Sequence, residues 1–157
     1  MATPASPKPV PPQGGEKISI RNGKLVDGSG NPWYHGDLAV KGDKIAALGK
    51  VTGKGKREID ARGLIVAPGF IDIHSHSDFT ILEDGDAQSK IRQGVTTEVV
   101  GMCGFSPGPI APGMRETVRD WIGGIGSKPP ATWQSFGEYL DHLRGLRTSV
   151  NVVQFVG

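Results

Sequence analysis

Short apolar runs separated by turn residues follow the first 16 residues of the chain. Ile18 and Ile20 alternate with polar residues and precede an Asn22-Gly23 pair, which predicts a strand followed by a hairpin turn. Further short strands are expected at residues 25–26, 36–40, 45–48, 58–60 and 64–66. Together these segments predict a small antiparallel β module.

The pattern changes after Pro68, where β-branched runs alternate with segments of helical periodicity. The three strands expected here are Ile71–His76, Val95–Met102 and Ser149–Val156. Helices are expected between them at residues 84–93 and 114–122, and from Thr132, as the N-cap, to a stop near Gly145. Strands separated by helices in this order predict βαβ units and a parallel sheet.

Two histidines lie one residue apart at the end of the first of these predicted strands. Because strand side chains alternate with a period of two, His74 and His76 should point to the same side, with Asp72 one layer deeper. Two imidazoles on one wall at the carboxyl end of a strand suit the binding of a divalent metal ion. Asp72 is then a candidate for holding an imidazole N–H.

The single cysteine follows the second predicted strand. Val99 and Cys103 share one face in the period-two pattern, so if Val99 faces the interior, Cys103 does too, beside the histidine pair. A thiolate there can bridge two metal ions, and metal binding lowers the pKa of a thiol. Two further residues, Asp78 and Ser106, are candidates for the same site, and each has one alternative role. Asp78 either reaches the site or caps a loop, and Ser106 either touches substrate or serves as a turn hydroxyl.

Charge and composition exclude several functional classes. Lys and Arg total 18 against 16 Asp and Glu, a formal charge of +2, and no basic run indicates a nucleic-acid surface. The densest positive stretch, Lys50–Arg57, is expected to be an exposed hairpin turn.

One cysteine excludes an intrachain disulfide. No apolar run approaches the roughly 20 residues that span a bilayer, and the N-terminus lacks the apolar core of a signal peptide. We therefore expect a cytoplasmic protein without a membrane or nucleic-acid partner; the oligomeric state stays open.

Three segments are expected along the chain. Residues 1–16 are a disordered Pro-rich tail, 17–66 form the β module, and 67–157 form β/α units. The sequence ends directly after a predicted strand, and a complete (β/α)8 barrel needs about 200 residues or more. We therefore expect a fragment of a larger protein, which on its own would be inactive and marginally folded.

Two motifs resemble a known family. Residues 63–78, GLIVAPGFIDIHSHSD, resemble the metal-dependent amidohydrolase superfamily, which includes dihydroorotase and dihydropyrimidinase. Residues 93–110, QGVTTEVVGMCGFSPGPI, resemble its D-aminoacylase (N-acyl-D-amino-acid deacylase) branch, in which a cysteine replaces the carboxylated lysine used elsewhere as the bridging ligand. The resemblance covers about residues 18 to 157.

The resemblance implies an α/β fold: the N-terminal part of a TIM-like (β/α)8 barrel, preceded by an incomplete β-sandwich module. It implies a zinc site of one or two ions, with His74, His76 and Cys103 as ligands. Two further histidines and a general-base aspartate would come from beyond the C-terminus. The implied enzyme is a hydrolase of carbon–nitrogen bonds other than peptide bonds, acting on linear amides. Its small-molecule substrate would be an N-acyl-D-amino acid.

Two other functions remain open at this point. The first is another metal-dependent amidohydrolase, acting on a cyclic imide or a dipeptide; Cys103 argues against those members that need a lysine bridge. The second is a non-catalytic, amidohydrolase-like protein used for assembly or binding. Such a protein should have lost its metal ligands, and the histidine pair and the cysteine are both present.

Overall fold

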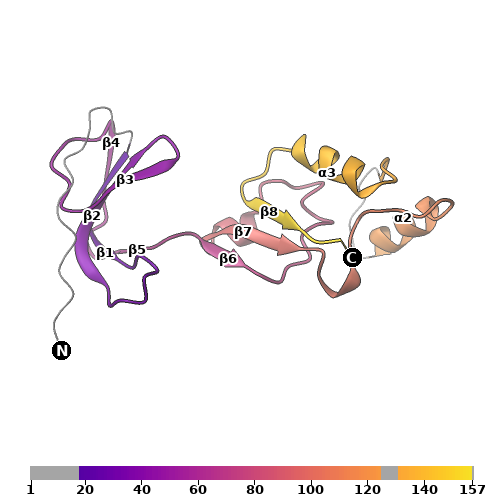
Figure 1. Cartoon of the computed structure of the whole chain (residues 1–157), viewed down its shortest axis with the longest axis horizontal. Coiled ribbons are helices and arrows are strands. Elements are labelled where there is room, and N and C mark those ends of the chain that lie inside the picture. The colour runs from indigo at the N-terminus through magenta and orange to yellow at the C-terminus, as the bar shows by residue number, and fades with distance from the viewer. Residues whose placement is uncertain (1–17, 125–130, 157) are drawn as a thin grey trace. The chain divides into compact units, whose positions relative to one another are not determined.

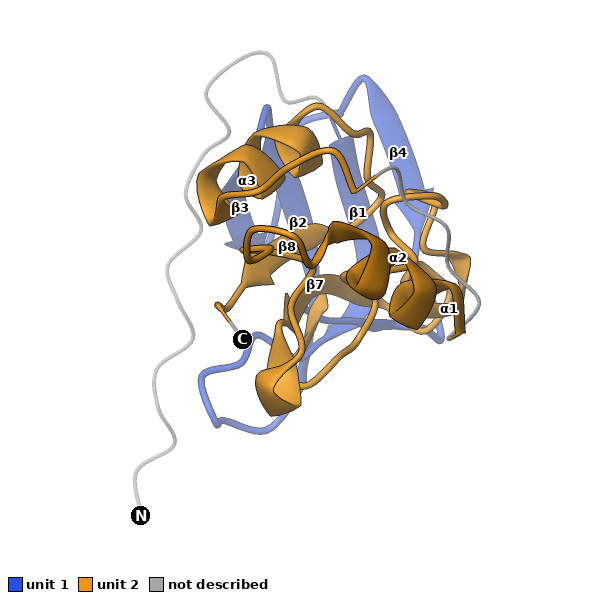
Figure 2. Ribbon diagram, turned by 90° about the vertical axis from the view of Figure 1, so that its right-hand side faces the viewer, with its two compact units in different colours: residues 1–68 blue, residues 69–157 orange. Residues whose placement is uncertain are grey.

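The computed structural model describes residues 18–124 and 131–156. It divides into two compact units, Met1–Pro68 and Gly69–Gly157 (Figure 2), and each unit has its own sheet. The predicted Pro-rich tail lies outside the described residues. Within the described ranges, no helix combines the length and the apolar composition that crossing a bilayer requires.

The first unit is one mixed sheet. Its strands are β1 Ile18–Leu25, β2 Tyr34–Lys41, β3 Lys44–Gly49, β4 Arg57–Asp60 and β5 Ile65–Val66. They are ordered β3-β2-β1-β4, and β5 also pairs with β1. The β1–β2 and β2–β3 pairs are antiparallel, whereas β4 and β5 run parallel to β1. The prediction of a purely antiparallel module was therefore wrong, because the chain after β3 crosses to the far side of β1 instead of turning back beside β3.

The predicted hairpin turn at Asn22-Gly23 is also wrong. Asn22 has a left-handed backbone, with φ of 61°, but it lies inside β1, where the register with β2 shifts between Ile20 and Gly23. This is a β-bulge, and Asn favours the same backbone conformation there as in a tight turn. The Asn22 backbone N–H donates to Asp37 Oδ1 (3.0 Å), which holds the extra residue against β2.

The segment Lys50–Arg57 is not the predicted hairpin turn. Residues 50–56 form a crossover loop, because the two strands that they join, β3 and β4, are not neighbours. Arg21 pins the loop to β1. Its guanidinium donates to the carbonyl oxygens of Val51 (2.6 Å) and Gly53, and pairs with the carboxylate of Asp37 at 3.2 Å. Loop carbonyls and an ion pair thus replace the strand pairing that a hairpin would provide.

The second unit has a parallel sheet with helices between its strands (Figure 1). Its strands, in spatial order, are β6 Phe70–Asp72, β7 Val95–Val100 and β8 Asn151–Gln154. Its helices are α1 Gln88–Ile91, the 3-10 turn η1 Met102–Gly104, α2 Arg115–Gly124 and α3 Phe136–Arg144. Both strand pairs are parallel, as the alternation of strands and helices predicted. Each strand is shorter than expected.

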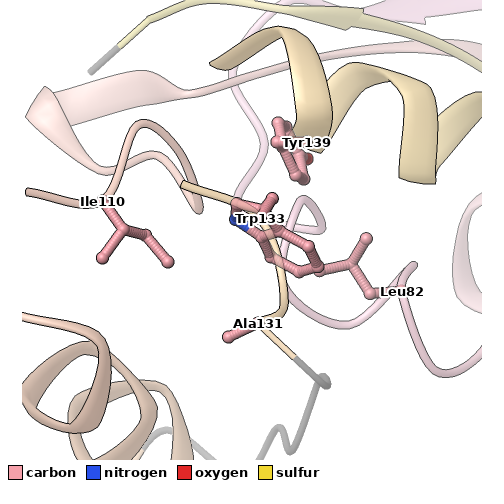
Figure 3. Close-up of a cluster of buried hydrophobic side chains, with 5 residues drawn as sticks. All are labelled: Leu82, Ile110, Ala131, Trp133 and Tyr139. Carbon is pink, nitrogen blue, oxygen red and sulfur yellow. The ribbon is translucent and has the colours of Figure 1, made fainter. Parts of the chain in front are cut away.

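A cluster of buried side chains forms a hydrophobic core of the second unit (Figure 3). Its members are Leu82, Ile110, Ala131, Trp133 and Tyr139. Two polar groups at this core are satisfied, since Trp133 Nε1 donates to the Pro107 carbonyl oxygen (2.7 Å) and the Tyr139 hydroxyl donates to Gln154 Oε1 (2.9 Å). The second bond joins α3 to β8.

Helix α3 begins three residues later than predicted, so Trp133 precedes it and Ser135, not Thr132, is its N-cap. The Ser135 hydroxyl accepts from the Glu138 backbone N–H (3.2 Å), and Glu138 Oε2 accepts from the Ser135 N–H (2.9 Å). This is a capping box. The glutamate three residues after Ser135 was the sequence signal for the correct start.

A Ser135→Ala variant should therefore lose about 0.5–2 kcal/mol in the free energy of unfolding, the usual contribution of an N-cap hydroxyl. Urea denaturation followed by circular dichroism measures this loss. Ser135→Asn is the matched control, because Asn is also a good N-cap and should retain most of the stability. Equal losses in both variants would mean that the cap does not stabilise α3.

Candidate metal centre

The two histidines lie in the loop after β6, not on the strand itself. The predicted strand Ile71–His76 ends at Asp72, because Asp72 Oδ1 accepts a hydrogen bond from the His74 backbone N–H (3.1 Å) and turns the chain. The loop still runs alongside β7, since the Ser75 N–H donates to the Val99 carbonyl oxygen (3.0 Å). The exposed rings of His74 and His76 remain neighbours, with centroids 5.6 Å apart.

The cysteine reaches the same place through a tight turn after β7. The strand ends at Val100, so Cys103 is not on its face as predicted; it lies in η1. Gly101 makes the turn possible: its φ is 80°, and a Cβ there would stand 2.3 Å from the Phe155 carbonyl oxygen. Cys103 itself has a left-handed backbone, with φ of 58°, which costs of order 1–3 kcal/mol in a residue other than glycine.

These three side chains converge. Cys103 Sγ lies 3.3 Å from His74 Nε2, and the ligand atoms of Cys103, His74 and His76 all lie within 4.8 Å of one another. No other group of three or more His, Cys, Asp or Glu with this spacing occurs in the described part of the chain. Two imidazoles and one thiol are donors that Zn²⁺ prefers. All three residues are exposed, so a small molecule can approach them.

The structure gives Asp72 another partner than the imidazole expected, and it gives Ser106 the turn bond that was one of its two alternatives. Asp72 Oδ2 pairs with the ammonium of Lys90 at 2.6 Å, and its other oxygen binds the His74 backbone instead of an imidazole. The hydrogen bond from Lys90 is the main cause that lowers the pKa of Asp72. Ser106 Oγ donates to the Gly108 carbonyl oxygen (2.6 Å), the bond of a turn hydroxyl.

Asp78 follows the two histidines by two residues, and its side chain is fully buried. Neither of its carboxylate oxygens has a hydrogen-bond partner of good geometry among the described residues. Burial raises the pKa of this carboxyl group. Burial, and then the nearby charge of Asp78, also raise the pKa of Tyr139. Asp78 is not among the three converging side chains.

Sequence reasoning missed two residues beside the site, Glu98 and Lys90. Glu98 is on β7 and fully buried, and its Oε1 lies 3.2 Å from the Lys90 ammonium. A glutamate within the β-branched run of β7 was the available signal, because buried carboxylates are rare unless they are paired. Its partner in α1 could not be found from spacing alone.

Comparison of the sequence with known protein families shows which family this chain belongs to. Residues 57–153 match the Amidohydrolase family, and the chain belongs to it. It is 41% identical over 141 residues to a D-aminoacylase from Alcaligenes xylosoxydans xylosoxydans, which covers 89% of this chain and 28% of that protein. The chain therefore spans less than a third of that relative's length.

Solved structures agree with this assignment. A D-aminoacylase described as having a binuclear metal centre aligns with a TM-score of 0.76 and 34% identity, over 90% of this chain and 30% of that one. An N-acyl-D-glutamate deacylase from Bordetella bronchiseptica, complexed with zinc and a phosphonate inhibitor, aligns with a TM-score of 0.78 and 36% identity. That match covers 91% of this chain and 30% of the deacylase. The mixed α/β architecture is thus that of the D-aminoacylase structures.

Proposed function

We propose that the second unit forms the first three β/α units of a TIM-like barrel and the first unit the N-terminal part of a β-sandwich domain. The parallel order β6-β7-β8 supports the barrel. The D-aminoacylase and deacylase structures support both parts, because they align over nine-tenths of this chain. In this proposal, the loops after β6 and β7 lie at the carboxyl ends of barrel strands, where such enzymes hold their catalytic groups.

We further propose that His74, His76 and Cys103 hold zinc, as one or two ions. Zinc bonds of about 2.0–2.1 Å to nitrogen and 2.3 Å to sulfur place tetrahedral ligand atoms roughly 3.3–3.8 Å apart. The Cys103–His74 pair is already at 3.3 Å, and the ligand atoms of all three residues lie within 4.8 Å of one another. The donor set therefore fits the ion.

We propose that the activity is hydrolysis of the amide bond of N-acyl-D-amino acids. The observation that carries this proposal is the convergence of the three ligands in a chain 41% identical to a D-aminoacylase. Bound zinc supplies Lewis acidity that activates water and polarises an acyl carbonyl group near neutral pH. The two loops of this chain would hold the ion, and the exposure of the three ligand residues would let a substrate approach it.

The test is an assay of the product of the complete reading frame that contains these residues. Zinc-loaded protein is offered paired N-acyl-D- and N-acyl-L-amino acids, together with cyclic imides and dipeptides, and release of free amino acid is measured. We expect turnover of the D series only, abolished by chelation and restored by zinc. Turnover confined to cyclic imides, dipeptides or the L series would contradict the proposed substrate.

A further inference from the structure

A polar network lies beneath the histidine loop, between α1, β6 and β7. Its centre is Glu98 Oε1, which accepts from the hydroxyls of Ser75 (2.7 Å) and Ser77 (2.7 Å). The Lys90 ammonium lies 3.2 Å from the same oxygen, donates to Ser75 Oγ (3.1 Å) and pairs with Asp72 at 2.6 Å. One ammonium thus connects the two carboxylates of neighbouring strands.

The residues of this network lie before and after the two histidines along the chain. Ser75 and Ser77 flank His76 directly, and Asp72 accepts from the backbone N–H of His74. None of these bonds uses a ring nitrogen. The network therefore fixes the backbone of residues 74–77 and leaves the imidazoles free to bind a ligand.

Packing alone does not explain a glutamate at position 98. Its side chain is fully buried, next to Val99 and Val100, and its second oxygen, Oε2, has no hydrogen-bond partner in the described structure. Removing a carboxylate and an ammonium from water is costly, and replacing a whole buried ion pair by apolar residues is often neutral or stabilising. An apolar pair would serve packing as well, whereas Glu98 also holds two hydroxyls of the histidine loop, so the carboxylate is placed to order that loop.

We propose that Glu98, with Lys90 as its counter-charge, is a positioning residue that holds the His74–Ser77 segment in the geometry for binding metal. This inference depends on the proposed metal centre. The network orders the loop before the metal binds. The loss of conformational entropy on ordering would otherwise oppose metal binding. Groups that orient metal ligands in this way typically contribute 10- to 100-fold to metal affinity.

The experiment compares the parent chain with Glu98→Val and with Glu116→Val, the same change at an exposed glutamate of α2. Zinc affinity is measured by chelator competition, and the cobalt-loaded proteins are compared by their thiolate charge-transfer absorption. We expect Glu98→Val to bind zinc about 10- to 100-fold more weakly and to shift the cobalt spectrum. Its metal-free unfolding midpoint should fall, because the substitution leaves the Lys90 ammonium and two serine hydroxyls without this acceptor. Glu116→Val should match the parent in all three measurements.

Affinities are compared under conditions in which circular dichroism shows both proteins folded. Unchanged zinc affinity in Glu98→Val would then overturn the positioning role, and so would a loss of affinity without any change in the cobalt spectrum. If Glu98→Val does not fold, Ser77→Ala removes one donor of the network with little change in volume. Weaker zinc binding by Ser77→Ala then supports the role, and unchanged binding overturns it. A parent chain that binds neither zinc nor cobalt would instead refute the proposed metal centre itself.

Discussion

A Cys103→Ser variant is expected to bind zinc at least about 100-fold more weakly than the parent. Loss of a residue that only orients a metal ligand lowers metal affinity by up to about 100-fold, and loss of a ligand itself should cost at least as much. Cys103 supplies the only thiol of the chain. A serine hydroxyl does not ionise near neutral pH, whereas a thiolate is a strong zinc ligand. In the product of the complete reading frame, hydrolysis should fall with metal occupancy. Chelator competition and an amide-hydrolysis assay measure the two effects.

Ser106→Ala is the control for this experiment. Ser106 lies three residues further along the same loop, and its hydroxyl binds the Gly108 carbonyl oxygen. The control should keep the zinc affinity of the parent. Full metal occupancy and turnover in Cys103→Ser would show that the thiol is not a ligand, and the proposed centre would then be wrong.

A Trp133→Ala variant is expected to lose about 3–5 kcal/mol in the free energy of unfolding, the range for a buried aromatic side chain. Trp133 is 2% exposed in the core of the second unit. The substitution leaves a cavity and also removes the donor for the buried Pro107 carbonyl oxygen. Urea denaturation followed by circular dichroism measures the loss without depending on tryptophan emission.

Trp33→Ala is the matched control, because Trp33 is 53% exposed in the first unit. Its removal should change the stability by much less. Comparable losses in the two variants would contradict the assignment of Trp133 to a hydrophobic core of the second unit.

Much of the fold followed from patterns within single segments. The alternation of strands and helices after Pro68 predicted the parallel sheet that the structure has. The period of two placed His74 and His76 on one side, and their rings are neighbours although β6 ends at Asp72, because the Ser75 N–H holds the loop beside β7. In contrast, Cys103 reaches the histidines through the turn at Gly101, which the strand pattern does not contain.

Other features depend on partners distant in sequence, and no local pattern reveals them. The placement of β4 parallel to β1 is fixed by the crossover that Arg21 pins through loop carbonyls. The left-handed Asn22 suits a hairpin turn or a bulge equally, and the pairing with β2 decides between them. Likewise, the role of Glu98 is visible only with Lys90 beside it.

X-ray absorption at the zinc edge of the zinc-loaded protein tests most directly whether these three side chains share one metal centre. The account predicts one sulfur neighbour at about 2.3 Å, imidazole nitrogens at about 2.0–2.1 Å, and loss of the sulfur signal in Cys103→Ser. A zinc coordination shell containing only nitrogen and oxygen in the parent protein would contradict it.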